Sequence, residues 1–173
     1  MDALELLGTF FEHECKVCRP DARHPAACYV FPVPPGSAQS LAKKSGATAA
    51  YRKQVHQHIA DNRYQTPTSH STRQVLNAPS IMRSGGRPRD ICVGLLFVFP
   101  VTAKNQDLDN SAKAFLDAIK GEAGLITDDM VIQHLECFKR VNSNGQTYTI
   151  PTGQINPLNH ILKYFVAVRI GLI

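Results

Sequence analysis

The stretch Asp107-Leu-Asp-Asn-Ser-Ala-Lys113-Ala-Phe-Leu-Asp117-Ala-Ile-Lys-Gly121 combines a predicted helix with a group of carboxylates. We expect the helix to span residues 108–120, with Asp109 as its N-cap and Gly121 as its end. Its apolar positions recur with helical spacing at Ala112, Phe115, Leu116 and Ile119. Its opposite face carries Asn110, Lys113, Asp117 and Lys120. The helix should therefore bury one face and present lysines beside carboxylates on the other.

The acidic residues of this region stand out against a basic protein. The whole chain of 173 residues has a formal net charge of +5, whereas residues 107–129 contain six acidic residues and two lysines. That window has a net charge of −4, so the rest of the chain carries +9. Carboxylates gathered inside a basic protein are typical of a divalent-cation site that acts on a polyanion, because the surrounding basic residues can hold phosphates.

The segments around this helix predict an α+β domain. Residues 90–101 form a near-continuous apolar run, which is typical of a central strand buried on both faces. Further strands are expected at residues 27–33, 131–141 and 160–170, and a second helix from Thr48, as N-cap, to residue 62. We expect loops at residues 37–46, 65–89 and 142–159. The predicted fold is a single domain with a mixed β-sheet and packed helices, in the order β-α-β-α-β-β.

An N-terminal extension, residues 1–27, precedes the predicted catalytic domain, residues 28–173. Leu4, Leu7 and Phe11 have the spacing of a short amphipathic helix over residues 3–14. The chain start contains acidic residues and no early basic region, and no apolar run approaches the length of a membrane span. We therefore expect a cytoplasmic protein.

The cysteines allow two interpretations. Five cysteines in a domain of this size fit reduced thiols better than a disulfide framework. The spacing of Cys15, Cys18, His24 and Cys28 also resembles a small zinc site, although the histidine lies one position late for a zinc knuckle. We favour reduced cysteines without a metal over Zn²⁺ at these four residues.

The acidic residues define a chemical hypothesis. Asp107 and Asp109 precede or begin the helix, and the pair Asp128-Asp129 follows it, so three carboxylates from two segments can supply oxygen ligands to Mg²⁺ or Mn²⁺. Lys113 lies one turn after Asp109, where its ammonium can stabilise charge on a phosphate. The alternative is ordinary helix capping, solvation and a surface pair between Lys113 and Asp117.

These residues also carry a family resemblance. The pattern Asp107-x-Asp109-Asn110-x2-Lys113-x3-Asp117, followed by Asp128-Asp129, resembles the signature of the RusA family of Holliday-junction resolvases. The resemblance implies a metal-dependent endodeoxyribonuclease that works as a homodimer and cuts four-way DNA junctions by paired symmetric nicks. It places catalytic metal ligands on Asp107, Asp109 and Asp129, and a catalytic lysine on Lys113. It gives supporting positions to Asn110, Asp117 and Asp128.

The predicted DNA surface is less complete than the predicted acidic site. Family members often have an arginine-rich run before the first aspartate, whereas this chain has Ala103-Lys-Asn-Gln106. We expect other cations to contact branched DNA, namely Lys43, Lys44, Arg73, Arg83, Arg87, Arg89 and Lys139. The resemblance implies a role in recombination, repair or phage DNA processing in a bacterial cell. A junction-binding module without catalysis is the alternative, and a phosphohydrolase of small nucleotides is disfavoured because it needs no extended basic surface.

Overall fold

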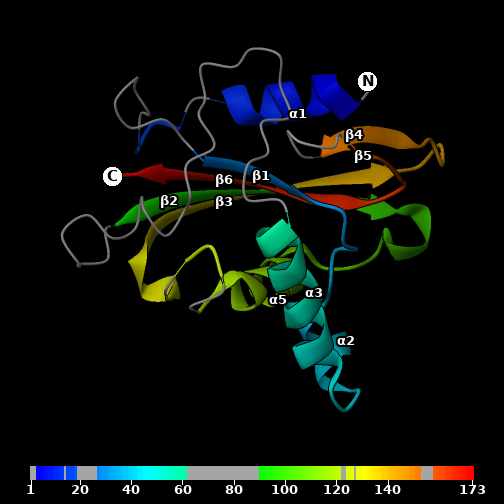
Figure 1. Cartoon of the computed structure of the whole chain (residues 1–173), viewed down its shortest axis with the longest axis horizontal. Helices are drawn as coiled ribbons and strands as arrows, with labels where there is room; N and C mark the ends of the chain where they lie inside the picture. Colours follow the sequence, from blue (N-terminus) through cyan, green and yellow to red (C-terminus); the bar gives the residue numbers. More distant parts are fainter. Residues whose placement is uncertain are drawn as a thin grey trace.

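The computed structural model describes residues 3–13, 15–18, 27–61, 90–121, 124–126, 128–152 and 158–173. A four-stranded mixed sheet with the strand order β1-β6-β2-β3 forms its centre. Helices cover both faces of this sheet, as Figure 1 shows, with α1 on one face and α2, α3 and α5 on the other. The predicted α+β class and the mixed sheet are confirmed.

The strands of the main sheet are β1 (Ala27–Phe31), β2 (Ile91–Pro100), β3 (Ile132–Asn142) and β6 (Phe165–Leu172). β2 pairs in parallel with β3 and antiparallel with β6, and β1 pairs antiparallel with β6. Helix α5 (Leu108–Ile119) makes the crossover between the parallel strands β2 and β3. The expected buried central strand is confirmed, because the first nine residues of β2 are all buried.

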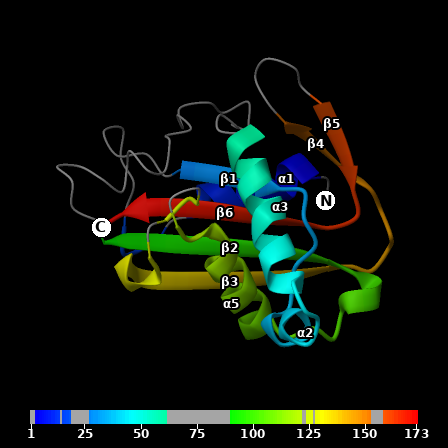
Figure 2. The ribbon, with the colours of Figure 1, turned by 60° about the horizontal axis from the view of Figure 1, so that its bottom comes forward.

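Side chains of β2 alternate between two apolar clusters. Val93 and Phe97 belong to the cluster under α3 (Ala47–Asp61) and α5, together with Phe115. Leu96 and Val98 belong to the cluster under α1 (Ala3–Glu12). This alternation follows from the period of two residues in a strand, and it explains why the sequence of β2 is apolar at nearly every position. Figure 2 shows α3 and α5 crossing the strands on their shared face.

The N-terminal helix α1 packs against one face of the main sheet. Leu7 and Phe11 of α1 are buried, and the ring of Phe10 makes an edge contact with Phe138 of β3 at 5.9 Å between centroids. The predicted amphipathic helix is therefore confirmed, and its apolar face covers the side of the sheet opposite α5.

Several local predictions need correction. Residues 37–46 contain a short helix, α2 (Ala38–Ala42), whose N-cap Ser37 accepts a hydrogen bond from the N–H of Ser40. Helix α3 begins at Ala47, so Thr48 lies inside it and is not its N-cap. Asp107, and not Asp109, occupies the N-cap position of α5.

The region after β3 differs most from the prediction. The loop predicted at residues 142–159 contains β4 (Tyr148–Thr152) and the start of β5 (Leu158–Leu162), and these two strands form an antiparallel hairpin. The single strand expected at residues 160–170 is two strands, because the chain leaves β5 after Leu162 and enters β6 at Phe165. Tyr148 packs its ring against Phe165 at 5.5 Å, so the hairpin adds to the apolar cluster under α1. The predicted loop at residues 65–89 lies outside the described residues.

Candidate functional site

The segment that leads into α5 is held by hydrogen bonds to distant parts of the chain. The ammonium of Lys139, on β3, donates hydrogen bonds to the carbonyls of Lys104 at 2.9 Å and Gln106 at 2.6 Å. The amide of Gln106 donates to the carbonyl of Gly36 at 2.6 Å and to the hydroxyl of Ser111 at 2.8 Å. These bonds hold residues 104–107 against β3 and against the segment after β1.

Asp107 has its side chain available for a ligand. Its backbone is extended, with φ −72° and ψ 138°, and its carbonyl accepts bonds from the N–H and the hydroxyl of Ser111. Its carboxylate makes no capping hydrogen bond to the helix backbone. Asn110 donates to that carboxylate only at the long distance of 3.5 Å. The backbone therefore positions Asp107 while its oxygens stay exposed.

Asp109 and Lys113 lie one helical turn apart on the exposed surface of α5. Successive helical residues are about 100° apart, so these two side chains project within about 40° of each other. Neither has a hydrogen-bond or ion-pair partner among the residues that the structure describes. The structure thus keeps the predicted neighbours Asp109 and Lys113 together, and both side chains are free to contact a ligand.

A cleft of about 690 Å³ lies between α2, α3 and α5. From α5 it is lined by Asp107, Asn110, Lys113 and Asp117, and from α3 by Tyr51 and Arg52. Arg52 donates a hydrogen bond to the carbonyl of Asp117 at 3.1 Å, which links the two helices. Both acidic and basic groups line this cleft, as a site for a phosphate and a cation requires.

Tyr51 forms one wall of this cleft and holds the chain after β1. Its hydroxyl donates to the carbonyl of Pro34 at 3.1 Å and accepts from the N–H of Gly36 at 3.3 Å. Burial raises the pKa of Tyr51 to about 12. The hydroxyl therefore stays protonated as a structural donor at neutral pH.

Asp128 and Asp129 have different local roles. Asp128 is the N-cap of the short helix η3 (Asp129–Val131), since its carboxylate accepts from the N–H of Met130 at 3.0 Å. Asp129 instead contacts the ammonium of Lys120 at 3.1 Å. A side-chain hydrogen bond with Asp128, followed by the contact with Lys120, lowers the pKa of Asp129. Asp128 is thus occupied as a cap, while Asp129 is an ionised group paired with a lysine.

Lys120 contacts two of the expected site residues, although it was not selected as a site residue from the sequence. Its ammonium lies 2.8 Å from the carboxylate of Asp117 and 3.1 Å from that of Asp129. These contacts, with Asp117 first, raise the pKa of Lys120. The sequence analysis considered a surface pair between Asp117 and Lys113. In the structure Asp117 pairs with Lys120 instead. The spacing of three residues between Asp117 and Lys120 was the available signal.

The structure does not gather the three aspartates that were expected to bind metal. Helix α5 has 12 residues and is therefore about 18 Å long. Asp107 and Asp109 lie at its N-terminal end, whereas Lys120, which contacts Asp129, follows its last residue. Among the described residues, the carboxylates of these three aspartates form no group with all ligand atoms within 4.8 Å of one another.

The expected DNA-binding residues fall into three groups. Lys43 and Lys44 are exposed on the turn between α2 and α3, next to the cleft. Lys139 uses its ammonium to hold residues 104–107 and lies 4.9 Å from the centre of the Phe99 ring. The remaining four arginines, Arg73, Arg83, Arg87 and Arg89, lie outside the described residues. Arg52, at the cleft, is an additional cation that the sequence analysis did not select.

The expected zinc ligands are only partly brought together. The sulfurs of Cys15 and Cys18 lie close to each other, and the third sulfur beside them belongs to Cys92. Cys28 instead packs in the apolar cluster under α1. His24 lies outside the described residues.

None of the described helices has the length and apolar composition that a membrane crossing requires. Comparison with individually curated proteins gives no match. Comparison with family models gives a match to the family described as endodeoxyribonuclease RusA, over residues 32–150. The matched region includes the cleft, α5 and both acidic segments, and it extends over more than half of the chain. The chain therefore belongs to the RusA endodeoxyribonuclease family.

Proposed function

We propose that this protein is a divalent-cation-dependent endodeoxyribonuclease that resolves four-way DNA junctions by paired symmetric nicks. The observation that carries the proposal is the family match across the cleft and the whole acidic segment. The biological setting that we propose is recombination, repair or phage DNA processing in the cytoplasm of a bacterial cell. Mg²⁺ or Mn²⁺ is the proposed cofactor.

The donor chemistry at the start of α5 fits such a cation. Asp107 and Asp109 offer exposed carboxylate oxygens, the hard ligands that Mg²⁺ and Mn²⁺ prefer. Neither carboxylate is used as a helix cap. When bound, a cation of this class polarises a phosphate oxygen and increases the acidity of a water molecule. We assign the binding of this cation to Asp107 and Asp109, with Asp129 as the third ligand.

The basic residues at the cleft act on the DNA backbone. Lys113 projects beside Asp109 and lines the cleft with Asp107, so its ammonium can contact the phosphate whose ester bond is cleaved. Arg52, Lys43 and Lys44 lie on the α2 and α3 side of the same cleft and provide contacts to neighbouring phosphates. Asn110, whose amide lies 3.5 Å from the carboxylate of Asp107, is a supporting residue in this proposal.

The position of Asp129 needs a separate explanation if this residue is to bind the same cation. In one chain it lies at the opposite end of α5 from Asp107 and Asp109. For Asp129 to join the same centre, either residues 128–131 move or a second copy of the chain supplies the carboxylate. We propose the second arrangement, because a homodimer also provides the two symmetric cuts that a four-way junction needs.

A junction-binding protein without catalysis is the competing function. The specific observation in its favour is that Asp129 pairs with Lys120 and that the three carboxylates do not come together in one chain. Such a protein would bind branched DNA through the same basic residues but would leave it uncut.

The test is cleavage of a labelled four-way junction and of a linear duplex with the same sequence. We expect Mg²⁺ or Mn²⁺ to be necessary, the junction to be preferred, and Asp109→Asn to abolish nicking while junction binding persists. Asp90→Asn is the matched control, because Asp90 is an exposed carboxylate directly before β2 that does not line the cleft. Equal activity of Asp109→Asn and Asp90→Asn would exclude the proposed site. Tight junction binding without cleavage in any divalent metal would favour the competing function.

A further inference from the structure

Three cysteines from two distant segments converge on the face of the sheet that α1 covers. Cys15 and Cys18 follow α1, and Cys92 is the second residue of β2. The three sulfur atoms all lie within 4.8 Å of one another. In the described part of the chain, this is the only group of three histidine, cysteine or acidic side chains with ligand atoms so close together. It is separate from the acidic segment and independent of the proposed nuclease function.

The turn at residues 15–18 and the glycine at position 171 leave room for this cluster. The N–H of Cys18 donates to the sulfur of Cys15 at 3.5 Å, so residues 15–18 form a tight turn around the sulfur. Cys18 lies above Gly171 of β6, which is the register partner of Cys92. A Cβ atom at Gly171 would be 2.7 Å from the sulfur of Cys18, closer than packing allows. The glycine therefore leaves the space in which the three sulfurs meet.

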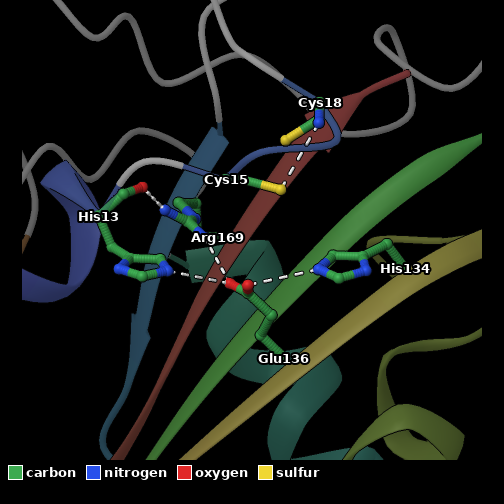
Figure 3. Close-up of polar contacts among 6 residues, drawn as sticks. All are labelled: His13, Cys15, Cys18, His134, Glu136 and Arg169. Carbon is green, nitrogen blue, oxygen red and sulfur yellow. Dashed lines mark hydrogen bonds and ion pairs between the residues drawn. The ribbon is translucent and has the colours of Figure 1, made fainter.

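A polar network around the buried Arg169 holds the turn in place. Arg169 of β6 is almost completely buried, donates to the carbonyl of His13, and forms an ion pair with Glu136 at 3.2 Å. Figure 3 shows this arginine between the cysteine turn and Glu136, which also contacts His13 and His134 at 3.3 Å each. The network fixes the end of α1 relative to the sheet, so the approach of Cys15 and Cys18 to Cys92 has a structural cause.

The local chemistry favours a cation among the sulfurs. Zn²⁺ binding requires the three thiols to be deprotonated, and sulfurs this close together as thiolates repel one another unless a cation lies between them. Thiolates are the ligands that Zn²⁺ prefers at structural sites.

We propose that Cys15, Cys18 and Cys92 bind one Zn²⁺ ion and thereby fasten the chain after α1 to the central strand of the sheet. This set differs from the one expected from sequence spacing, because Cys92 takes the place of Cys28. A structural zinc site needs a fourth ligand in addition to the three thiolates. His134 is the register partner of Cys92 on β3, but its Nε2 contacts Glu136, so the proposal rests on the three sulfurs.

The first test is the zinc content of the full-length protein purified with reductant and without chelator, together with its free thiol count. We expect one zinc per chain and loss of that zinc in Cys92→Ser. Cys28→Ser and Cys137→Ser are matched controls that should retain it, since neither sulfur belongs to the cluster. Wild-type protein with no more zinc than Cys92→Ser would overturn the proposal. Loss of zinc in Cys28→Ser with retention in Cys92→Ser would overturn this choice of ligands.

A second test avoids dependence on a cysteine variant that fails to fold. Wild-type protein stripped of metal under reducing conditions is titrated with Co²⁺, and its absorption spectrum is recorded. We expect saturation at one Co²⁺ per chain, with the thiolate charge-transfer bands and visible bands of a tetrahedral site. Gly171→Ala should weaken Co²⁺ binding at least several-fold, because its new methyl group displaces the sulfur of Cys18. A Co²⁺ spectrum without thiolate bands, or a Cys15–Cys18 disulfide that persists in reductant, would contradict the site.

Discussion

One substitution at Lys139 distinguishes whether its side chain holds residues 104–107 in place or contacts DNA. Sequence reasoning assigned this lysine to DNA, whereas the structure shows its ammonium bound to the carbonyls of Lys104 and Gln106. We therefore consider Lys139→Met, which keeps the aliphatic stem of the side chain and removes its charge. Lys104→Met is the matched control, because Lys104 lies in the same region with an exposed side chain. Its hydrogen bond with Lys139 is made by its backbone carbonyl, which the substitution leaves in place.

The size of the effect follows from the two hydrogen bonds. A hydrogen bond to a charged group contributes about 1.5–3 kcal/mol, and the partial exposure of Lys139 reduces that value, so we expect a loss of about 2–4 kcal/mol in unfolding free energy. For a chain of this length, such a loss corresponds to a decrease in Tm of roughly 4–16 °C. Lys104→Met should change the unfolding free energy by less than about 0.5 kcal/mol, as surface substitutions commonly do.

Two assays separate the roles. Thermal or urea unfolding measures the stability loss, and junction binding at several salt concentrations measures the number of phosphate contacts. If Lys139 positions residues 104–107, Lys139→Met lowers stability and the nicking rate while the salt dependence of binding stays unchanged. If Lys139 contacts a phosphate, stability is retained and the slope of log K against log salt decreases by about one. The second result would refute the positioning role.

Three further outcomes follow from the structure. Lys120→Met should lower the unfolding free energy by at most about 1 kcal/mol at neutral pH, because its pairs with Asp117 and Asp129 are partly exposed to solvent. Since the pKa of Asp129 is lowered, the part of this difference that comes from Asp129 should shrink as acidification protonates that carboxylate, and urea unfolding at several pH values measures it. An equimolar mixture of Asp109→Asn and Asp129→Asn chains, refolded together, should recover junction nicking if Asp129 acts across the dimer, and no recovery would contradict that arrangement. Phe115→Ala should cost about 3–5 kcal/mol in urea unfolding, because its fully buried ring makes edge contacts with two other phenylalanines; a smaller loss would contradict the packing of α5 on the sheet.

The parts of the fold with one dominant local pattern could be predicted from sequence. β2 is apolar throughout because both of its faces are buried, and α5 has a clear apolar stripe because only one of its faces packs on the sheet. The β4–β5 hairpin could not be predicted in this way. Its stability depends on a long-range contact, the packing of Tyr148 against Phe165, which the spacing of apolar residues does not reveal.

In the candidate site, too, contacts set by local geometry could be predicted from the sequence, whereas contacts set by tertiary packing could not. The proximity of Asp109 and Lys113 follows from helical geometry alone, so it could be read from the sequence. The position of Asp129 depends on the path of the chain after α5. There the chain turns at Gly121, which has a φ of 101°, and Asp129 then meets Lys120. The meeting of Cys92 with Cys15 and Cys18 depends on how α1 packs on the sheet, so spacing alone selected Cys28.

The most direct test of the proposed function is the position of the cuts in a four-way junction. Four versions of the junction, each labelled on a different strand, are incubated with the wild-type protein and Mg²⁺ or Mn²⁺, and the products are resolved at single-nucleotide length. We predict nicks at symmetric positions in one pair of opposing strands, absent without metal and absent with Asp107→Asn or Asp109→Asn. Intact strands in every divalent metal tested, with the junction still bound, would contradict this function.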